Sequence, residues 1–317
     1  MKHVLVTGGA GFIGSHLVER LLKDGRRVVV IDDLSTGSRD NLRAFAANPN
    51  LRLIEAKISA CPELATLTEQ SESIYHLAAA VGVELVVKSA IHVIATNLHE
   101  TEVLLEAAAP AGVPVLIAST SEVYGKSQKA EFSEEDDLLI GPPQQSRWSY
   151  ACSKLMDEFL ALAFVKERGL PATIVRLFNT VGPRQTGRYG MVLPRFITAA
   201  RSSAPLKVYG DGLQSRCFCY VLDTVEALVR LQNNPAARGE IFNIGGTEEV
   251  SILDLARLVV EELGAKSALE FVPYSQAYAP GFDDMRRRKP CTEKLARVTG
   301  FHPQTSLREI IRRTAAS

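Results

Sequence analysis

The stretch from Val4 to Gly14 constrains the fold more than any other part of the chain. A short apolar run ends at Gly8, and apolar residues at helical spacing begin directly after the glycines. Gly8, Gly11 and Gly14 lie three residues apart, so the backbone can turn sharply and approach a ligand closely. The helix that follows presents unpaired N–H groups and a partial positive charge to that turn. The stretch therefore predicts a strand, a tight turn and a helix that together bind a pyrophosphate.

A second apolar run, Val28–Ile31, ends in an acid that narrows the choice of ligand. Asp32 follows the glycines by about twenty residues, the position from which a carboxylate binds the ribose hydroxyls of an adenosine. The same charge would repel a 2′-phosphate. The predicted cofactor is therefore NAD rather than NADP.

Further apolar runs alternate with helical patterns, which is typical of a doubly wound parallel sheet. Beyond Asn179, loops rich in glycine, proline and arginine replace this alternation. We expect an α/β fold of the Rossmann type in two parts. An NAD-binding domain covers residues 1–178 and is joined again by about 221–245, and a smaller substrate-binding part covers 179–317. The expected strands after the second are 51–55, 73–77, 113–118, 172–177 and 241–245, and the longest expected helices are 95–109 and 149–168.

The composition excludes several classes of partner. The 36 Lys and Arg residues balance 36 Asp and Glu residues, so no net charge attracts nucleic acid or an anionic membrane surface. The five cysteines are an odd number without metal-site spacing, and we expect reduced thiols, no bound metal and a cytoplasmic location. No apolar run approaches the roughly 18 residues that a membrane helix needs, so no membrane association is expected.

Tyr150 and Lys154 are catalytic candidates, because residues four apart on a helix lie on one face. A phenol with a pKa of about 10 is a poor base at neutral pH. A lysine ammonium and the positive nicotinamide ring beside it favour the phenolate. Hydroxyl and carboxylate side chains also follow the expected strand 113–118, where ligands bind such sheets. They are Thr120, Ser121 and Glu122.

Motifs along nearly the whole chain are similar to those of one enzyme family. They are Thr7-Gly8-Gly9-Ala10-Gly11-Phe12-Ile13-Gly14, His76-Leu77-Ala78-Ala79, Ser119-Thr120-Ser121-Glu122-Val123-Tyr124-Gly125, Tyr150 with Lys154, Arg176-Leu177-Phe178-Asn179-Thr180-Val181-Gly182-Pro183-Arg184, Val208-Tyr209-Gly210-Asp211-Gly212, and Arg286-Arg287-Arg288-Lys289-Pro290. With them the sequence resembles the extended short-chain dehydrogenase/reductases, specifically the NAD-dependent nucleotide-sugar epimerases, dehydratases and decarboxylases. The resemblance implies a tightly held NAD, a UDP-sugar substrate, and a homodimer paired through the helices 95–109 and 149–168.

The resemblance also implies a role for each site residue. Tyr150 takes the proton of a sugar hydroxyl while the sugar gives hydride to NAD, and Thr120 hydrogen-bonds the reacting oxygen. The 4-keto sugar is then epimerised, dehydrated or decarboxylated and takes the hydride back. The implied cofactor-binding residues are Gly8, Gly11, Phe12, Ile13, Asp32, Ile58, Leu77, Ala78, Ala79, Asn97, Tyr150 and Lys154. The implied substrate-binding residues are Asn179, Arg216 and Arg288 at the diphosphate, Tyr209 near the base, and Arg188 near the sugar.

The motifs leave the reaction open. Thr120-Ser121-Glu122 looks like the triplet of UDP-glucuronate decarboxylases, whereas Arg147-Trp148-Ser149-Tyr150 looks like a sugar epimerase sequence. Arg188 would clamp a C6 carboxylate and protect it from loss, which favours a 4-epimerase acting on UDP-glucuronate or UDP-glucose. The alternatives are a UDP-glucuronate decarboxylase forming UDP-xylose and a sugar or carbonyl reductase that consumes NAD(P)H. A non-catalytic NAD sensor would lack Tyr150 or Lys154, and both are present.

One residue departs from the family pattern. Lys57 stands where the family usually has an acid that binds the adenine amino group, and lysine has no hydrogen-bond acceptor. Either the backbone makes the adenine contact, or the affinity for NAD is lowered. Lys57 also weakens the preference for NAD over NADP, because its charge would suit a more negative cofactor.

Overall fold

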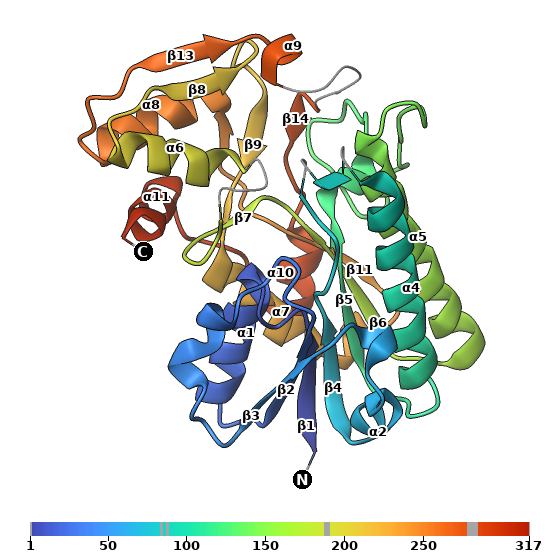
Figure 1. Ribbon diagram of the computed structural model, residues 1–317. Coiled ribbons are helices and arrows are strands. Elements are labelled where there is room, and N and C mark those ends of the chain that lie inside the picture. Colours follow the sequence, from blue (N-terminus) through green and yellow to red (C-terminus); the bar gives the residue numbers. More distant parts are fainter. Residues whose placement is uncertain (1, 83–84, 87–88, 187–190, 278–284, 317) are drawn as a thin grey trace.

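A parallel sheet forms the centre of the protein (Figure 1). The computed structural model describes residues 2–82, 85–86, 89–186, 191–277 and 285–316. Every neighbouring pair of strands in the seven-stranded sheet is parallel, which confirms the predicted doubly wound α/β fold. Across the sheet the strands are β11 (Ile241–Ile244), β6 (Ala172–Leu177), β5 (Val115–Thr120), β4 (Ser71–His76), β1 (His3–Thr7), β2 (Val28–Asp32) and β3 (Leu51–Glu55).

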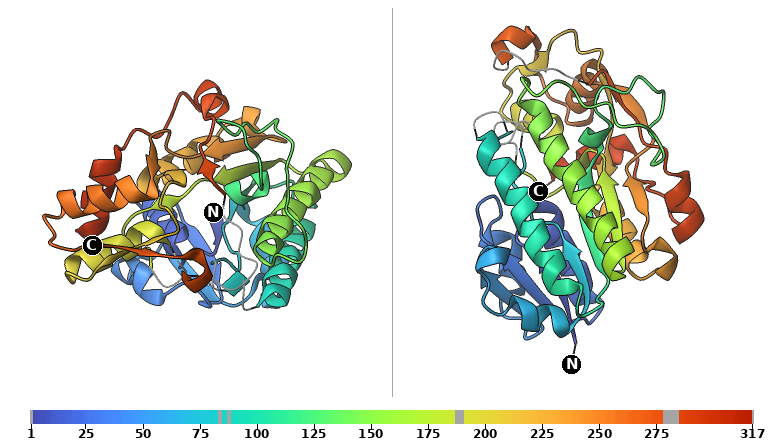
Figure 2. Two further views of the ribbon diagram at one scale, coloured as in Figure 1. Left: turned by 90° about the horizontal axis from the view of Figure 1, so that it is seen from above. Right: turned by 90° about the vertical axis from the view of Figure 1, so that its right-hand side faces the viewer.

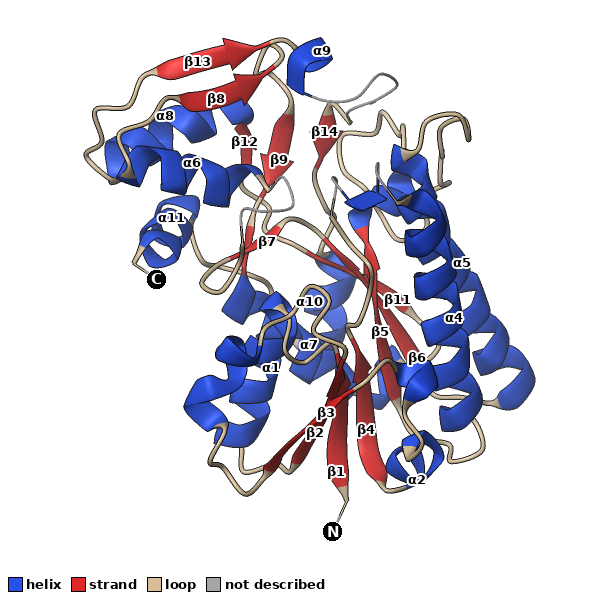
Figure 3. Ribbon diagram, in the orientation of Figure 1, coloured by secondary structure: helices blue, strands red, loops and turns tan. Residues whose placement is uncertain are grey.

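Helices cover both faces of this sheet, as Figure 3 shows. Successive side chains of a strand point to opposite faces. In β1, Val4 and Val6 therefore pack into the hydrophobic core on one face, and Leu5 packs into the core on the other. The first core is closed by α1 (Phe12–Lys23), α7 (Val221–Gln232) and α10 (Glu293–Thr299), and the second by α2 (Leu64–Glu69), α4 (Ala90–Ala108) and α5 (Arg147–Arg168).

A smaller part with its own core lies beyond the carboxyl ends of the strands, at the top of Figure 1. Helices α6 (Val192–Arg201), α8 (Ile252–Glu262) and α11 (Leu307–Ala315) pack together in it, beside the parallel pair β8 (Leu206–Tyr209) and β13 (Leu269–Val272). The remaining strands are β7 (Thr180–Val181), β9 (Ser215–Cys217), β10 (Cys219–Tyr220), β12 (Glu249–Ser251) and β14 (Arg287–Arg288). The remaining helical turns are η1 (Arg39–Phe45), η2 (Ile58–Ala60), η3 (Ser121–Tyr124), η5 (Pro235–Ala237) and α9 (Tyr274–Ala277).

The chain crosses between these parts more than once. From the C-terminal half, α7 packs on α1, β11 pairs with β6, and α10 packs on both α7 and β11. Residues 221–245, which the sequence predicts to join the NAD-binding domain, and also α10 thus share a core with residues 1–178. The division into domains remains a prediction.

Some element boundaries differ from those expected. Helix α5 begins at Arg147 rather than at residue 149, because the N–H groups of Trp148 and Ser149 already bond to the carbonyls of Gln145 and Ser146. Strand β5 ends at Thr120 rather than 118, since its pairing with β6 continues to that residue. The polar residues of the segment before α5 suggest a surface loop, but part of this segment is buried. Its Phe132 is fully buried against Tyr124.

In the described part of the chain, no helix combines the length and hydropathy that crossing a bilayer requires.

Large apolar side chains lie exposed on α4 and α5, which run side by side along one flank (Figure 2). Ile91 of α4 is 86% exposed, and Met156 and Phe159 of α5 are 52% and 60% exposed. An apolar surface shared by two adjacent helices is typical of a protein interface. These helices contain the segments that the sequence predicts to pair in a homodimer, which remains a prediction.

We expect Phe159→Asp to convert a dimer into a monomer, because a carboxylate buried in that interface would lose its water. Sedimentation velocity of the wild type and the variant measures this directly. Leu213→Asp is the control, since Leu213 is 66% exposed but lies away from both helices. A wild type that sediments as a monomer, or a variant that remains a dimer, would contradict the expectation.

Candidate active site

A cavity of about 470 Å³ opens at the carboxyl ends of the central strands. The chain leaves β1 toward β2 and β3 on one side, and continues from β4 toward β5 and β6 on the other. Open parallel sheets bind ligands at such a switch point. Except for Arg188, which lies outside the described residues, every site residue expected from the sequence lines this one cavity.

The glycine turn has no room for side chains. Gly8 has a φ of +71°, and a Cβ on Gly14 would lie 2.1 Å from the carbonyl oxygen of Gly8. Gly11 begins α1 without a side-chain cap, so the first N–H groups of the helix are left for another acceptor. Phe12 and Ile13 follow and line the cavity. This uncapped helix start fits the pyrophosphate of a dinucleotide.

Asp32 is the last residue of β2 and lies beside the glycine turn. Its carboxylate accepts the N–H of Ala10 at 2.8 Å and the N–H of Leu34 at 2.9 Å. Burial raises the pKa of Asp32, and these backbone bonds oppose the rise. The side chain thus braces the glycine turn and also lines the cavity, where a ribose would bind.

The segment that follows β4 forms another part of the cavity wall. Leu77, Ala78 and Ala79 line the cavity directly after the strand. Asn97 of α4 is 2% exposed and holds this segment, because its Oδ1 accepts the N–H of Ala80 at 2.8 Å and its Nδ2 donates to Ser153 Oγ at 3.1 Å.

The cavity is also lined, just beyond β3, by Ile58, which is 3% exposed, and by the exposed Lys57. Lys57 precedes η2 and brings a cation to this end of the cavity. The consequence for cofactor affinity remains a prediction.

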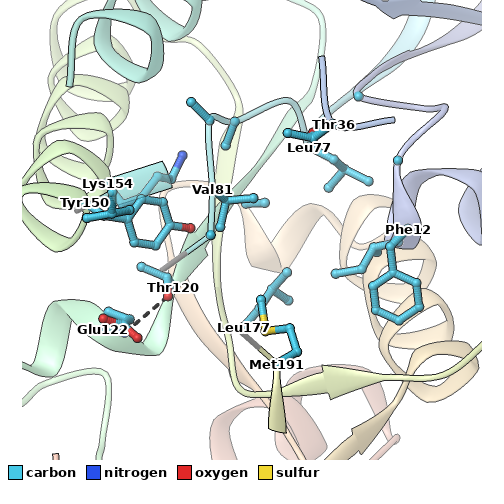
Figure 4. Close-up of a pocket in the computed structure, with 18 of the residues that line it drawn as sticks. Phe12, Thr36, Leu77, Val81, Thr120, Glu122, Tyr150, Lys154, Leu177 and Met191 are labelled. Atoms are coloured by element: carbon cyan, nitrogen blue, oxygen red, sulfur yellow. Dashed lines mark hydrogen bonds between the residues drawn. The ribbon is translucent and has the colours of Figure 1, made fainter. Parts of the chain in front are cut away.

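Tyr150 lies in the first turns of α5, and Figure 4 shows its hydroxyl directed toward Thr120. Burial raises the pKa of Tyr150, and the negative charges of Glu122 and Asp157 raise it further. The hydroxyl of Thr120 and the guanidinium of Arg288 lower it. Tyr150 therefore needs its neighbours in order to act as a base near neutral pH.

Lys154 lies one turn further along α5 and is 2% exposed. Its ammonium donates to Asp157 Oδ2 at 2.6 Å, and Asp157 is fully buried. The sequence predicts Lys154 as the cation that supports Tyr150 but does not predict that an acid is paired with it. The spacing of Lys154 and Asp157 could have indicated the pair, since residues three apart on a helix share a face.

Glu122 lies where several cations converge. Its Oε1 accepts Arg288 Nη1 at 2.9 Å, and Arg147 Nη2 lies 3.4 Å away. Arg288 also donates through Nη2 to Asn179 Oδ1 at 3.0 Å, and its Nη1 lies 3.5 Å from Ser121 Oγ. Arg147 was missed as a site residue, although it precedes Tyr150 by three positions on one helix face.

The far end of the cavity belongs to the smaller part. Tyr209 and the 7%-exposed Arg216 line it, as expected. The guanidinium of Arg195 lies 4.3 Å from the centre of the Tyr209 ring. Arg195 of α6, Lys207 of β8 and Tyr274 of α9 also line the cavity, and none of them belongs to a motif that the sequence analysis singled out.

Among the residues described, no three His, Cys, Asp or Glu side chains gather as a metal site would require.

Together, an uncapped glycine turn, an acid at the end of β2, and a tyrosine and lysine on α5 define a short-chain type enzyme that uses NAD. The chain belongs to the NAD dependent epimerase/dehydratase family, whose model matches residues 4–245. NAD is the cofactor of that family, and the cavity has the turn and the carboxylate that NAD requires.

Relatives within the family catalyse different reactions. The chain is 41% identical, over 99% of its length and 96% of the relative, to UDP-N-acetyl-alpha-D-glucosaminuronate decarboxylase of Bacillus cytotoxicus. It is 34% identical, over 99% of its length and 71% of the relative, to UDP-glucuronic acid decarboxylase 1 of Xenopus tropicalis. UDP-glucuronic acid 4-epimerase from Bacillus cereus, solved with UDP-glucuronic acid and NAD, superposes with a TM-score of 0.88 at 31% identity, covering 100% of this chain and 98% of that one.

We expect Gly14→Ala to weaken NAD binding by about tenfold or more, because the new methyl group would displace the carbonyl of Gly8 from the turn. Isothermal titration with NAD measures the loss. Gly264→Ala is the control for general destabilisation, since its φ is +58° and nothing lies within 4 Å of an added Cβ. Unchanged NAD affinity in folded Gly14→Ala protein would contradict the assignment of the turn.

Proposed function

We propose that the protein is an NAD-dependent decarboxylase of a UDP-linked uronic acid. The observation that carries the proposal is the position of Glu122 beside Thr120 and Tyr150, where it is paired with Arg288. The decarboxylases among the relatives support the same reaction, with UDP-glucuronate or its 2-acetamido counterpart as the substrate.

Tyr150 and Thr120 are suited to act on the C4 hydroxyl of the sugar. Tyr150, as phenolate, accepts the proton of that hydroxyl, and Thr120 holds the same oxygen by a hydrogen bond. When bound, NAD would accept the hydrogen of C4 as a hydride and would later return it to C4. The cation of Arg288 favours the phenolate that begins this step.

A ketone at C4 makes the C6 carboxylate a β-keto acid, which can leave as CO2. The C5–C6 bond breaks, and its electron pair moves onto the C4 oxygen as an enolate. Tyr150, now protonated, and Thr120 both donate hydrogen bonds to that oxygen. C5 then takes a proton that comes from solvent, and the ketone is re-formed. Return of the hydride to C4 and of the Tyr150 proton to the C4 oxygen completes the turnover.

The charge of Glu122 favours loss of the carboxylate over its retention. Arg288 and Arg147 are both directed at Glu122, so their charges are partly neutralised before a substrate binds. A sugar carboxylate in this region meets a like charge, whereas neutral CO2 does not. We infer that the site destabilises the bound carboxylate relative to the departing product.

A 4-epimerase acting on UDP-glucuronate, which the sequence favours, is the second candidate. The superposition with the Bacillus cereus epimerase supports it, since the two folds agree over the whole chain. Epimerisation requires the 4-keto ring to turn and offer its other face while the carboxylate is retained. The residue expected to clamp that carboxylate, Arg188, lies outside the described residues.

The products decide between these reactions. Purified protein is incubated with NAD and, separately, UDP-glucuronate, UDP-N-acetylglucosaminuronate and UDP-glucose, and the products are resolved by NMR. We expect CO2 and a UDP-pentose, such as UDP-xylose from UDP-glucuronate. UDP-galacturonate would replace the proposal by the epimerase, and a need for stoichiometric NADH would indicate a reductase.

Tyr150→Phe should lower kcat by at least about 10²-fold while the protein retains NAD, because only the proton acceptor is removed. Rates and bound NAD are measured on the same preparation. Tyr124→Phe is the matched control, since Tyr124 is buried and its hydroxyl donates to Asn243 Oδ1 at 2.8 Å. Retained turnover in Tyr150→Phe would show that another group is the base.

A further inference from the structure

Helix α5 holds a buried pair of opposite charges behind the site. The side chains of Lys154 and Asp157 are 2% and 0% exposed, and they meet at 2.6 Å. A buried ammonium without a counter-ion readily gives up its proton, because burial disfavours the charged form. The ion pair with Asp157 offsets the free-energy cost of burying the Lys154 ammonium and fixes the direction in which the ammonium points.

The neighbouring carboxylates are already engaged by other partners. Glu158 pairs with Arg176 at 2.8 Å, and Glu100 accepts the hydroxyl and the N–H of Ser59. Glu122, across the cavity, pairs with Arg288. In the described part of the chain, Asp157 is thus the carboxylate that forms an ion pair with Lys154. The titratable groups that interact with the charges of the pair are His76 from β4 and Tyr150 and Glu158 from α5, and Glu122 and Arg288 act on Tyr150 beside them.

The Oδ1 of Asp157 is buried and accepts no hydrogen bond within the described part of the chain, although Thr101 of α4 faces the side chain. Burial raises the pKa of Asp157, and the Lys154 ammonium and the Thr101 hydroxyl oppose the rise. Thr101 is bonded to His76 Nε2 at 3.0 Å, and His76 Nδ1 is bonded to the Thr7 hydroxyl at 2.8 Å. Burial lowers the pKa of His76 to about 3, so His76 is neutral at working pH and does not compete as a cation for Asp157.

We propose that Asp157 is a positioning residue that keeps the Lys154 ammonium charged and aimed at Tyr150 and the cofactor. The proposal rests on the catalytic roles proposed for Tyr150 and Lys154. Lys154 has three donors, and the bond to Asp157 uses one. Two therefore remain for the cavity that Lys154 lines.

Asp157 also affects the base itself. Its negative charge is one of the groups that raise the pKa of Tyr150. Removing that charge lowers the pKa of Tyr150, so the acidic limb of the pH–rate profile moves to lower pH. Lys154 without its counter-ion also loses its proton at lower pH, so the alkaline limb moves in the same direction. Both limbs therefore shift together toward acid, and a merely structural role would not produce this shift.

The test uses protein labelled with ¹³Cε-lysine, loaded with NAD, and titrated by NMR. The Lys154 signal is identified by its absence in Lys154→Arg. We expect it to remain that of an ammonium throughout the pH range of activity in the wild type. In Asp157→Asn it should become that of a neutral amine at a pH lower by at least about one unit. If Asp157→Asn does not fold, Asp157→Ser removes the same charge and leaves space for water.

Glu167→Gln is the control, because it removes a carboxylate from the exposed far end of the same helix, away from Lys154. It should leave the melting temperature, the Lys154 titration and both pH limbs in place. A Lys154 signal that titrates alike in wild type and Asp157→Asn would overturn the proposal. So would a wild-type Lys154 that is already neutral during turnover, and this result needs no variant.

The NMR titration does not depend on which sugar is converted. If no UDP-uronate is decarboxylated but the Lys154 titration still shifts, the proposed substrate fails and the role of Asp157 stands. If the enzyme decarboxylates UDP-uronates but the titration does not shift, the role of Asp157 fails alone.

Discussion

The ion pair between Glu158 and Arg176 joins α5 to β6, and the geometry of the candidate site depends on it. Arg176 donates from Nε and Nη2 to the two carboxylate oxygens at 3.0 and 2.8 Å, and both side chains are 3% exposed. Ser119, near the end of β5, donates to the same carboxylate at 2.5 Å. Loss of one partner of a buried pair typically costs about 3–5 kcal/mol, because the other charge remains buried. The pair thus fixes α5 next to the strand end that carries Thr120.

Two further ion pairs lie at the candidate site. Lys154 is balanced by Asp157 inside the protein, and Arg288 is balanced by Glu122 at the cavity wall. Burial raises the pKa of Tyr150, and the charges of Glu122 and Asp157 raise it further, whereas the Arg288 guanidinium lowers it. Glu122 also places a negative charge in the cavity, which is the basis of the proposed decarboxylation.

The sequence predicted the parts of the structure that follow from local rules. The glycine turn could be recognised because close backbone contacts leave no room for side chains, as Gly14 illustrates. The buried strands are short apolar runs, so the parallel sheet was also predictable. The pairing of Glu122 with Arg288 could not be predicted from spacing, since 166 residues separate them and the contact depends on the fold that brings β14 to the cavity wall. The burial of Phe132 and the inward position of Arg147 depend likewise on packing between distant segments.

In the proposed reaction, the hydrogen at C4 is removed and returned within one turnover while the carboxylate is lost. The most direct measurement follows UDP-glucuronate deuterated at C4 in ordinary water, with CO2 counted and the sugar product analysed by mass spectrometry and NMR. The account predicts one CO2 for each substrate consumed, deuterium retained at C4, and a solvent-derived hydrogen at C5. A product that keeps its carboxylate, or one whose deuterium has been lost to water, would contradict it.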